Sequence, residues 1–437
     1  MTSKPDALAA LLRGEWRDPD SGAPIHLPPL AVAIERSLEG SEADLVAPLR
    51  LGRRLAVVSD PATRGVLGTR IERALARVAA IEPVILDAEP HADASTVATL
   101  RRASASADAL IAVGSGTIND LCKYAAALES KPYAVFATAP SMNGYTSKNA
   151  AITVDGLKKS LAAAAPVGVF VDLTVLAAAP KRMIRAGLGD SMCRSTAQAD
   201  WLLSHLLFDT PYRDAPFALL AADEPALLDE PHALLRNDPD AMRALARTLI
   251  LSGLGMTICD GSYPASQAEH LISHYIDMRA PADRAAYFHG EQVGVATLTM
   301  ARIQETVLAG GPPQLHLDAI EASELQRRFG DDVGASCWQE FDRKRLTAEA
   351  CASLQRHIDT RWDDIVATLR RAMIPAERIH AVLRHANCPL TPADIGLDEG
   401  FYAKAIRDAR FLRDRFTFLD LAADSQHRGV VNAALAG

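Results

Sequence analysis

The stretch DALIAVGSGTIND (residues 108–120) decides the fold of the N-terminal half of the chain. A short apolar run, typical of a buried strand, leads through a glycine-containing turn into a segment with helical periodicity that reaches Leu128. Gly114 and Gly116 allow the backbone to approach a ligand closely, and the free N–H groups of a new helix favour a phosphate. The spacing differs from GxGxxG, and structural tight turns of this kind outnumber phosphate sites, so both interpretations stay open for the turn alone.

Short apolar runs and helical segments alternate on both sides of this stretch. The expected strands are LAVVSD (55–60), PVILD (83–87), the run that begins at Asp108, YAVFATAP (133–140) and VGVFVD (167–172), with helices extending to about Ala80, near 95–106 and to Leu128. Strands that alternate with helices predict a Rossmann-like parallel sheet with helices on both faces. Residues 1–50 carry no motif that points to a function.

After about Pro180 the short apolar runs disappear, and long segments rich in Ala, Leu and Arg with helical spacing take their place. The expected helices are 189–208, 216–230, 240–258, 265–278, 289–308, 348–372 and 400–416. We therefore expect an α/β domain over residues 1–178 and an all-α domain over residues 179–437.

The bulk composition excludes several classes of function. The chain has 437 residues, 49% of them apolar and 23% charged, and a formal net charge of −8, which disfavours binding to nucleic acid. No apolar stretch is long enough to span a bilayer, and the N-terminus does not resemble a signal peptide, so we expect a cytoplasmic protein without membrane insertion. The six cysteines lack CxxC spacing and predict neither a disulfide framework nor a thiolate metal site.

Three histidines form a candidate metal site in SQAEHLISHYIDMRAPADRAAYFHG (266–290). His270 and His274 stand four apart on a predicted helix and share one face, and His289 comes after a polar break. Neutral imidazole suits zinc, nickel and iron, although histidines on helix faces are more often structural. Asp190, in AGLGDSMCRSTAQADW (186–201), offers a carboxylate that would complete the set and leave open positions for substrate; the alternative is a helix N-cap.

Two further features are candidate contacts for a bound dinucleotide. Asp60 ends the first clear strand, where a carboxylate can accept hydrogen bonds from an adenosine ribose and repel a 2′-phosphate, which favours NAD over NADP. The loop TAPSMNGYTSKNAAI (138–152) is rich in hydroxyl groups that could contact a phosphate, a ribose or a substrate. An ordinary connecting loop remains the alternative.

As an ordered set, these motifs resemble the sn-glycerol-1-phosphate dehydrogenases of the iron-containing alcohol dehydrogenase, glycerol dehydrogenase and dehydroquinate synthase-like superfamily. The resemblance is carried by GSGTIND, TAPSMNGYTS, AGLGDSMCRSTAQADW, AEHLISHY and FHGEQVGV and covers about residues 50–300. The chain looks closest to the bacterial branch. The resemblance implies a dehydroquinate synthase-like fold, with a dinucleotide-binding N-terminal domain, a helical metal- and substrate-binding C-terminal domain, and a homodimer or larger homo-oligomer.

The resemblance also implies roles for individual residues. The metal ligands would be Asp190, His270 and His289, and His274 would face the substrate. The cofactor, NAD or NADP, would lie against residues of the glycine turn and of the loop after the next strand, namely Gly114, Ser115, Gly116, Thr117, Asp120, Thr138, Ser141 and Ser147.

One position departs from the family pattern. The family usually has an aspartate that contacts the substrate where this chain has Asn143, which brings an N–H₂ donor and no charge. The expected reaction is the metal-dependent, NAD(P)-linked reduction of dihydroxyacetone phosphate to sn-glycerol 1-phosphate, or of a closely related small polyol and carbonyl pair, with His274 and Asn143 at the reacting molecule. The alternatives are a sugar-phosphate cyclase of the dehydroquinate synthase type and a non-catalytic homologue that binds metal and dinucleotide.

Overall fold

A computed structural model describes residues 6–154, 157–281, 285–425 and Val430. By its contacts the chain divides into two compact units. The first unit comprises the residues up to Ser191 together with Arg213–Ser262, and the second comprises Met192–Tyr212 and the residues from Tyr263 onward. Within the described ranges, no helix has the length and apolar character that crossing a membrane requires.

The first unit is built on a parallel sheet of six strands in the order β1-β8-β5-β4-β2-β3. The strands are β1 (Ala31–Glu35), β2 (Arg54–Ser59), β3 (Ala80–Ile85), β4 (Ala109–Gly114), β5 (Tyr133–Ala137) and β8 (Gly168–Asp172). The predicted parallel sheet is confirmed. Strand β1 had no counterpart in the sequence prediction: it is short, lies at the edge of the sheet and pairs with β8, which is distant in sequence.

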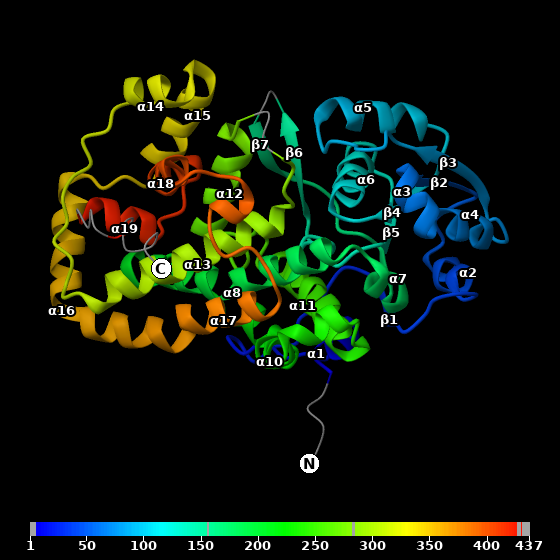
Figure 1. Cartoon of the computed structure of the whole chain (residues 1–437), viewed down its shortest axis with the longest axis horizontal. Helices are drawn as coiled ribbons and strands as arrows, with labels where there is room; N and C mark the ends of the chain where they lie inside the picture. Colours follow the sequence, from blue (N-terminus) through cyan, green and yellow to red (C-terminus); the bar gives the residue numbers. More distant parts are fainter. Residues whose placement is uncertain (1–5, 155–156, 282–284, 426–429, 431–437) are drawn as a thin grey trace, which may run out of the picture. The chain divides into compact units, whose positions relative to one another are not determined.

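Helices cover both faces of this sheet, as Figure 1 shows. Helices α2 (Glu42–Val46) and α4 (Thr69–Leu75) lie on one face, and α5 (Ala94–Ala103) and α6 (Gly116–Leu128) lie on the other. Apolar side chains of alternate strand positions form one buried cluster with residues of α2 and α4, and within it Phe136 and Phe170 pack with their ring centroids 4.8 Å apart. This burial supports the strand ends that carry the predicted site.

A two-stranded antiparallel hairpin comes after β5. It is formed by β6 (Asn149–Val154) and β7 (Leu157–Ala162), with Asn149 paired to Ala162. The segment 138–152, expected as a loop from its polar composition, is therefore a loop only as far as Lys148. From Asn149 onward the chain forms a strand because its backbone pairs with β7 along the whole length of β6, from Asn149 opposite Ala162 to Val154 opposite Leu157.

The first unit continues beyond the expected boundary at residue 178. Its remaining elements are α1 (Ala7–Leu12), η1 (Ala47–Leu49), α3 (Pro61–Thr63), η2 (Arg64–Gly68), α7 (Leu173–Ala178), α9 (Ala215–Leu220), α10 (Glu224–Asp229), η3 (Pro231–Arg236) and α11 (Pro239–Ile258). Helix α11 packs against α7 and β1, and Arg243 donates a hydrogen bond to the carbonyl of Ile34. The change from strands to helices thus falls near the expected position, whereas the compact unit extends past it. The helix expected at 216–230 is two helices, α9 and α10.

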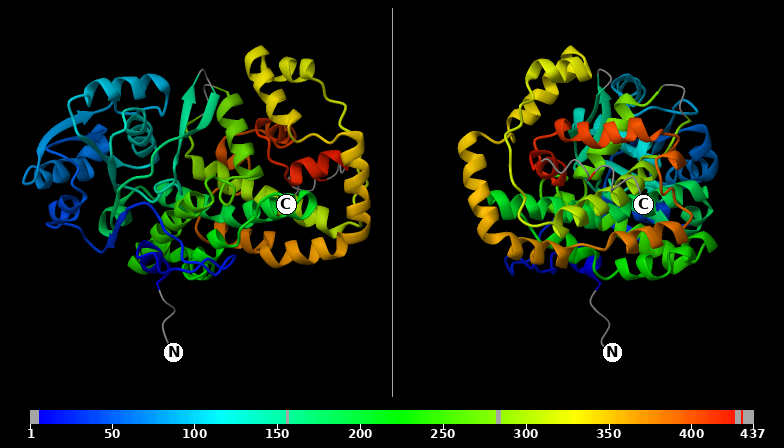
Figure 2. Two further views of the ribbon diagram at one scale, coloured as in Figure 1. Left: turned by 180° about the vertical axis from the view of Figure 1, so that it is seen from behind. Right: turned by 60° about the vertical axis from the view of Figure 1, so that its left-hand side comes forward.

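The described part of the second unit contains helices and no strand (Figure 2). They are the later part of α8 (Lys181–Phe208), α12 (Ala268–Arg279), α13 (His289–Ala309), α14 (Ala322–Phe329), α15 (Asp331–Asp342), α16 (Ala348–Ala372), α17 (Ala376–His385), η4 (Ala393–Ile395), α18 (Glu399–Asp408), η5 (Ala409–Leu412) and α19 (Phe418–Asp424). Leu354, Ile358, Trp362, Ile365 and Leu369 recur at helical spacing on α16 and are buried in one apolar core. The predicted helical C-terminal part is confirmed.

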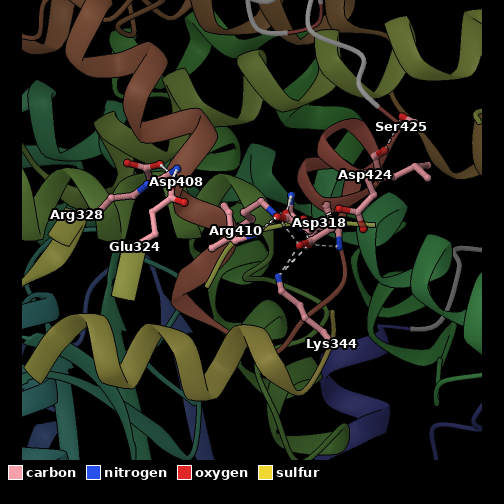
Figure 3. Close-up of polar contacts among 12 residues, drawn as sticks. Asp318, Glu324, Arg328, Lys344, Asp408, Arg410, Asp424 and Ser425 are labelled. Atoms are coloured by element: carbon pink, nitrogen blue, oxygen red, sulfur yellow. Dashed lines mark hydrogen bonds and ion pairs between the residues drawn. The ribbon is translucent and has the colours of Figure 1, made fainter. Parts of the chain in front are cut away.

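Buried ion pairs hold the last helices of the second unit together (Figure 3). Arg410 contacts Asp420, Asp424 and Asp318 at 3.1, 2.9 and 3.1 Å, so its charge is neutralised by carboxylates. Lys344 adds a contact of 2.9 Å to Asp420 and donates a hydrogen bond of 2.8 Å to the carbonyl of Arg415. These contacts anchor the segment between η5 and α19.

Candidate dinucleotide site and metal centre

The register of the sheet brings the predicted cofactor residues to one edge. Val58 of β2 pairs with Ala112 of β4, and Gly114 pairs with Ala137 of β5. Two residues beyond the first pair, Asp60 and Gly114 leave the sheet at the same level, and Thr138 comes directly after β5 at the same edge. The crevice between β2 and β4 is also where the strand order reverses, which is where open α/β sheets bind dinucleotides.

The glycine turn has the structure that the sequence predicts, with β4 ending at Gly114 and α6 beginning at Gly116. Ser115 is the N-cap residue of α6, and its side chain makes no capping hydrogen bond. A Cβ atom on Gly114 would lie 2.5 Å from Cβ of Ile118, and one on Gly116 would lie 3.1 Å from Cγ of Met142. The glycines therefore allow the turn to pack closely against the side chains of Ile118 and Met142.

Asp60 has a structural role in addition to its position. It is the N-cap of α3, where Oδ1 accepts a hydrogen bond of 2.7 Å from the main-chain N–H of Thr63 and the Thr63 hydroxyl lies 3.0 Å from the main-chain nitrogen of Asp60. Its other carboxylate oxygen has no hydrogen-bond partner in the parts of the chain that the structure describes. That oxygen remains available for a ribose hydroxyl.

A buried lysine holds the loop after β5. Lys123 of α6 is fully buried, and its Nζ donates to the carbonyls of Gly144 and Asn149 at 2.6 and 3.0 Å and to Oγ of Ser147 at 3.1 Å. Burial lowers the pKa of Lys123, while the nearby carboxylate of Asp120 opposes that shift. The hydroxyl of Ser147 thus serves the internal structure of the loop, in which Thr138, Ser141 and Asn143 are also buried.

Asp120, a predicted cofactor residue, connects α6 to the hairpin. Its Oδ2 accepts a hydrogen bond of 3.1 Å from the main-chain N–H of Ala151 in β6, and its Oδ1 accepts one of 3.2 Å from the side chain of Asn119. Thr117 lies in the first turn of α6. Thr117 and Asp120 therefore both belong to the first half of α6, directly after the glycine turn.

Asp190 lies in the middle of α8 rather than at its start. The helix begins at Lys181, so the N-cap interpretation of Asp190 is wrong. The helix passes close to the loop after β5, because a Cβ on Gly187 would lie 1.6 Å from the carbonyl oxygen of Pro140. One turn later, Oδ2 of the buried Asp190 accepts a hydrogen bond of 2.7 Å from the main-chain N–H of Asn143.

The three predicted histidines gather within the second unit. His270 and His274 lie on α12, and His289 is the first residue of α13. The ring centroids of His270 and His289 are 5.1 Å apart, and His274 lies 6.4 Å from His270 and 6.1 Å from His289. The three rings therefore lie together, and the role of this group as a metal site stays a prediction.

A buried carboxylate orients the ring of His270. Glu269 lies 2.9 Å from Nδ1 of His270, and its two oxygens also accept hydrogen bonds from the main-chain N–H of Gln267 at 2.8 Å and the hydroxyl of Thr196 at 3.2 Å. A carboxylate that accepts from Nδ1–H fixes the tautomer in which Nε2 has a free lone pair. His270 is therefore arranged as a metal ligand commonly is.

His289 is oriented in the same way by neutral partners. Its Nδ1 lies 3.1 Å from the hydroxyl of Ser273, which donates onward to Oε1 of Gln292 at 3.2 Å. Because that hydroxyl proton is used on Gln292, Ser273 accepts from Nδ1–H of His289, and the lone pair of the ring is then on Nε2. Ser273 and Gln292 are both buried.

His274 differs from the other two histidines. Its Nε2 faces a guanidinium nitrogen of Arg413 at 3.3 Å. An arginine can only donate hydrogen bonds, so Nε2 of His274 accepts a hydrogen bond from the guanidinium of Arg413.

A buried cysteine also lies near the histidines. The sulfur of Cys193 is within 4.8 Å of a ring nitrogen of His270 and 3.5 Å from the carbonyl of Ala265.

Comparisons with known proteins agree with this geometry. A family model described as iron-containing alcohol dehydrogenase matches residues 33–180. The glycerol-1-phosphate dehydrogenase [NAD(P)+] of Bacillus licheniformis is 32% identical over 319 residues, 69% of this chain and 79% of that protein. The enzyme of that name from Geobacillus stearothermophilus is 30% identical over 405 residues, 89% and 92% of the two chains. The chain belongs to the glycerol-1-phosphate dehydrogenase family.

Solved structures with low identity share the fold of this family member. A probable glycerol dehydrogenase from Sinorhizobium meliloti superposes with a TM-score of 0.61 at 18% identity, covering 93% of this chain and 97% of the other. Glycerol dehydrogenase from Schizosaccharomyces pombe gives a TM-score of 0.62 at 15% identity, covering 94% and 91%. The resemblance inferred from five motifs is confirmed, and the match to the Geobacillus protein extends it beyond residues 50–300.

Sequence reasoning missed several residues of this glycerol-1-phosphate dehydrogenase homologue. Four residues form hydrogen bonds to predicted site residues but were not predicted themselves. They are Lys123, Glu269, Ser273 and Arg413. A weak signal was available for Lys123, which interrupts an apolar helix face, and for Glu269, which directly precedes a candidate ligand. For Arg413 there was none, because it lies far from His274 in sequence.

Proposed function

We propose that this chain reduces dihydroxyacetone phosphate to sn-glycerol 1-phosphate with a nicotinamide dinucleotide and a divalent metal ion. The single observation that supports this most is the matched orientation of His270 and His289, each with Nδ1 occupied by a buried partner. Histidines that bind a metal usually donate their other ring N–H to a fixed partner, as both of these do. A purely structural role would not require this orientation in both rings. Family membership supplies the substrate, since the relatives are named glycerol-1-phosphate dehydrogenases.

The proposed ligands are Asp190, His270 and His289. One carboxylate and two imidazoles fit zinc, nickel or iron and leave coordination positions for a substrate oxygen. When bound, the ion would polarise the substrate carbonyl while the dinucleotide supplies a hydride. The chain itself holds the ligands in place: the main-chain N–H of Asn143 donates to Asp190, and Glu269 and Ser273 fix the two rings.

We place the dinucleotide at the carboxyl edge of β2, β4 and β5. The pyrophosphate would lie at the start of α6, beside Gly114 and Gly116, where the N–H groups of the first turn point outward. The free oxygen of Asp60 would accept a hydrogen bond from a ribose hydroxyl and disfavour a 2′-phosphate, so NAD is preferred over NADP. Thr138 and Ser141 are the polar side chains of the adjoining strand end.

His274 and Asn143 would meet the reacting molecule. An imidazole can orient a substrate oxygen or pass a proton through water. Asn143 would offer its side-chain amide as a donor, in place of the carboxylate that the family usually has there. The substrate would be a small phosphorylated ketone, and the active form a homodimer or larger assembly, which light scattering in solution would test.

Loss of NADH absorbance with dihydroxyacetone phosphate, measured on metal-depleted protein with zinc, nickel or iron added back, tests the proposal. We expect turnover that depends on the metal, and loss of both metal and turnover in Asp190→Asn and His289→Ala. His385→Ala is the matched control, because it removes an exposed imidazole of α17. Phosphate release without net oxidation of NADH would indicate a sugar-phosphate cyclase instead, and dinucleotide binding without either reaction would indicate a non-catalytic homologue.

A further inference from the structure

Arg413 is a cation with neutral partners beside the candidate active-site histidines. It lies in the segment between η5 and α19 and donates hydrogen bonds to Oγ of Ser266 at 3.2 Å and to Nε2 of His274 at 3.3 Å. Within the described ranges of the chain, no carboxylate lies within ion-pair distance of Arg413. Arg410, three residues earlier, has three such partners.

A second guanidinium converges on the same point. Arg415 donates to the main-chain carbonyl of Ser266 and lies over the ring of Tyr263, 4.3 Å from its centroid. Burial, together with the positive charge of Arg413, lowers the pKa of Arg415 to about 9, and burial also lowers the pKa of Arg413. Arg413 and Arg415 both contact Ser266, so their positive charges repel each other. An anion bound between the two guanidinium groups would reduce this repulsion.

This pair of cations is also held in a fixed place. Lys344 donates to the carbonyl of Arg415, and the main-chain N–H of Phe418 donates to the buried carboxyl group of Asp200 at 2.9 Å. The neighbouring Arg410 is held by ion pairs with the carboxylates of Asp420 and Asp424 (Figure 3). A binding group that is ordered before its ligand arrives loses less entropy on binding, so the segment 413–415 is suited to a small anion.

We propose that Arg413, supported by Arg415, binds the phosphate group of the substrate, and that this contact selects phosphorylated ketones over unphosphorylated ones. The inference rests on the proposed function for the substrate's identity. Arginine presents a planar set of donors that matches two phosphate oxygens at once. With the phosphate at Arg413, the rest of a three-carbon substrate would extend past His274, the histidine already in contact with that arginine.

The kinetic test compares dihydroxyacetone phosphate with dihydroxyacetone in Arg413→Met. We expect the ratio of the two kcat/KM values to fall at least about tenfold, mainly through a higher KM for the phosphorylated substrate, as the loss of a charge-assisted contact predicts. Arg413→Lys should recover part of the ratio, since it keeps the charge without the paired donors. Arg407→Met, which removes an exposed arginine of α18, is the control and should leave the ratio unchanged. A variant that lowers kcat/KM equally for both substrates would overturn the proposal and indicate a structural role.

A second measurement does not depend on turnover. Inorganic phosphate should raise the melting temperature of the wild-type holoprotein in a saturable way, and Arg413→Met should lose that response while Arg407→Met retains it. Equal stabilisation of wild type and Arg413→Met would overturn the phosphate site. A wild type that binds phosphate through Arg413 but does not reduce dihydroxyacetone phosphate would refute the proposed reaction and leave the anion site standing.

Discussion

The main-chain N–H of Asn143 donates a 2.7 Å hydrogen bond to Oδ2 of Asp190. This contact connects the loop after β5 with the middle of α8, and it uses the backbone rather than the side chain of residue 143. The replacement of the family's usual aspartate by asparagine therefore does not alter how Asp190 is held. At the side chain the replacement exchanges a carboxylate for an uncharged amide, which is the group that we propose faces the substrate.

The close approach of α8 to this loop predicts a strong effect of Gly187→Ala. The added methyl group would lie 1.6 Å from the carbonyl oxygen of Pro140, so the helix or the loop must move. We expect the free energy of unfolding to fall by at least about 2 kcal/mol, in the range of overpacked cores. Gly65→Ala is the matched control, because a Cβ there meets nothing within 4 Å. Chemical denaturation of both variants checks this, and equal stability of the two would contradict it.

The contact between Glu269 and His270 predicts weaker metal binding in Glu269→Gln. Without the carboxylate, Nδ1–H of His270 loses its charged acceptor, and its Nε2 becomes a poorer and less well oriented ligand. We expect the metal affinity to fall about 10- to 100-fold with the fold retained. Competition with a chelator, followed by metal analysis, measures it. Glu349→Gln, on the exposed face of α16, should bind metal as the wild type does.

The position of Asp60 predicts a change in cofactor preference in Asp60→Ser. Serine can still cap α3, but it removes the negative charge that would repel a 2′-phosphate. We expect the ratio of kcat/KM for NADPH to that for NADH to rise about tenfold, or about 1.4 kcal/mol. Asp93→Ser makes the same change at the N-cap of α5 and serves as the control. An unchanged ratio in Asp60→Ser would place the ribose elsewhere.

The raised pKa of Asp200 makes the free energy of unfolding depend on pH. Burial, and to a lesser extent the nearby charge of Glu269, raises the pKa of Asp200 to about 8, whereas an unfolded aspartate titrates near 3.8. At a pH between these two pKa values, the carboxyl group of Asp200 is protonated in the native protein and ionised in the unfolded chain. The stabilising contribution is therefore complete below about pH 4 and is lost as the pH rises toward 8, at up to about 1.4 kcal/mol per pH unit.

Urea unfolding of the wild type and Asp200→Asn at several pH values between 5 and 8 tests this. The slope of unfolding free energy against pH should be more negative in the wild type than in the variant, which has no proton to lose at this position. Identical slopes would mean that Asp200 is charged in the native state, where it accepts hydrogen bonds from Ala268 and Phe418.

By itself the sequence determined the alternation of strands and helices up to Asp172, the helical character of the chain after Pro180, and the residue types that suit a metal and a dinucleotide. These depend on local patterns: an apolar run ending in a glycine turn, or two histidines four apart, reflects contacts within a few residues. Only the tertiary structure decided that β1 pairs with β8, that α11 belongs with the sheet, and that Asp190 lies within a helix rather than at its cap. It also decided that Arg413 contacts His274, 139 residues away in the chain. Such contacts depend on which surfaces are buried together, and that burial leaves no periodic trace in the sequence around either partner.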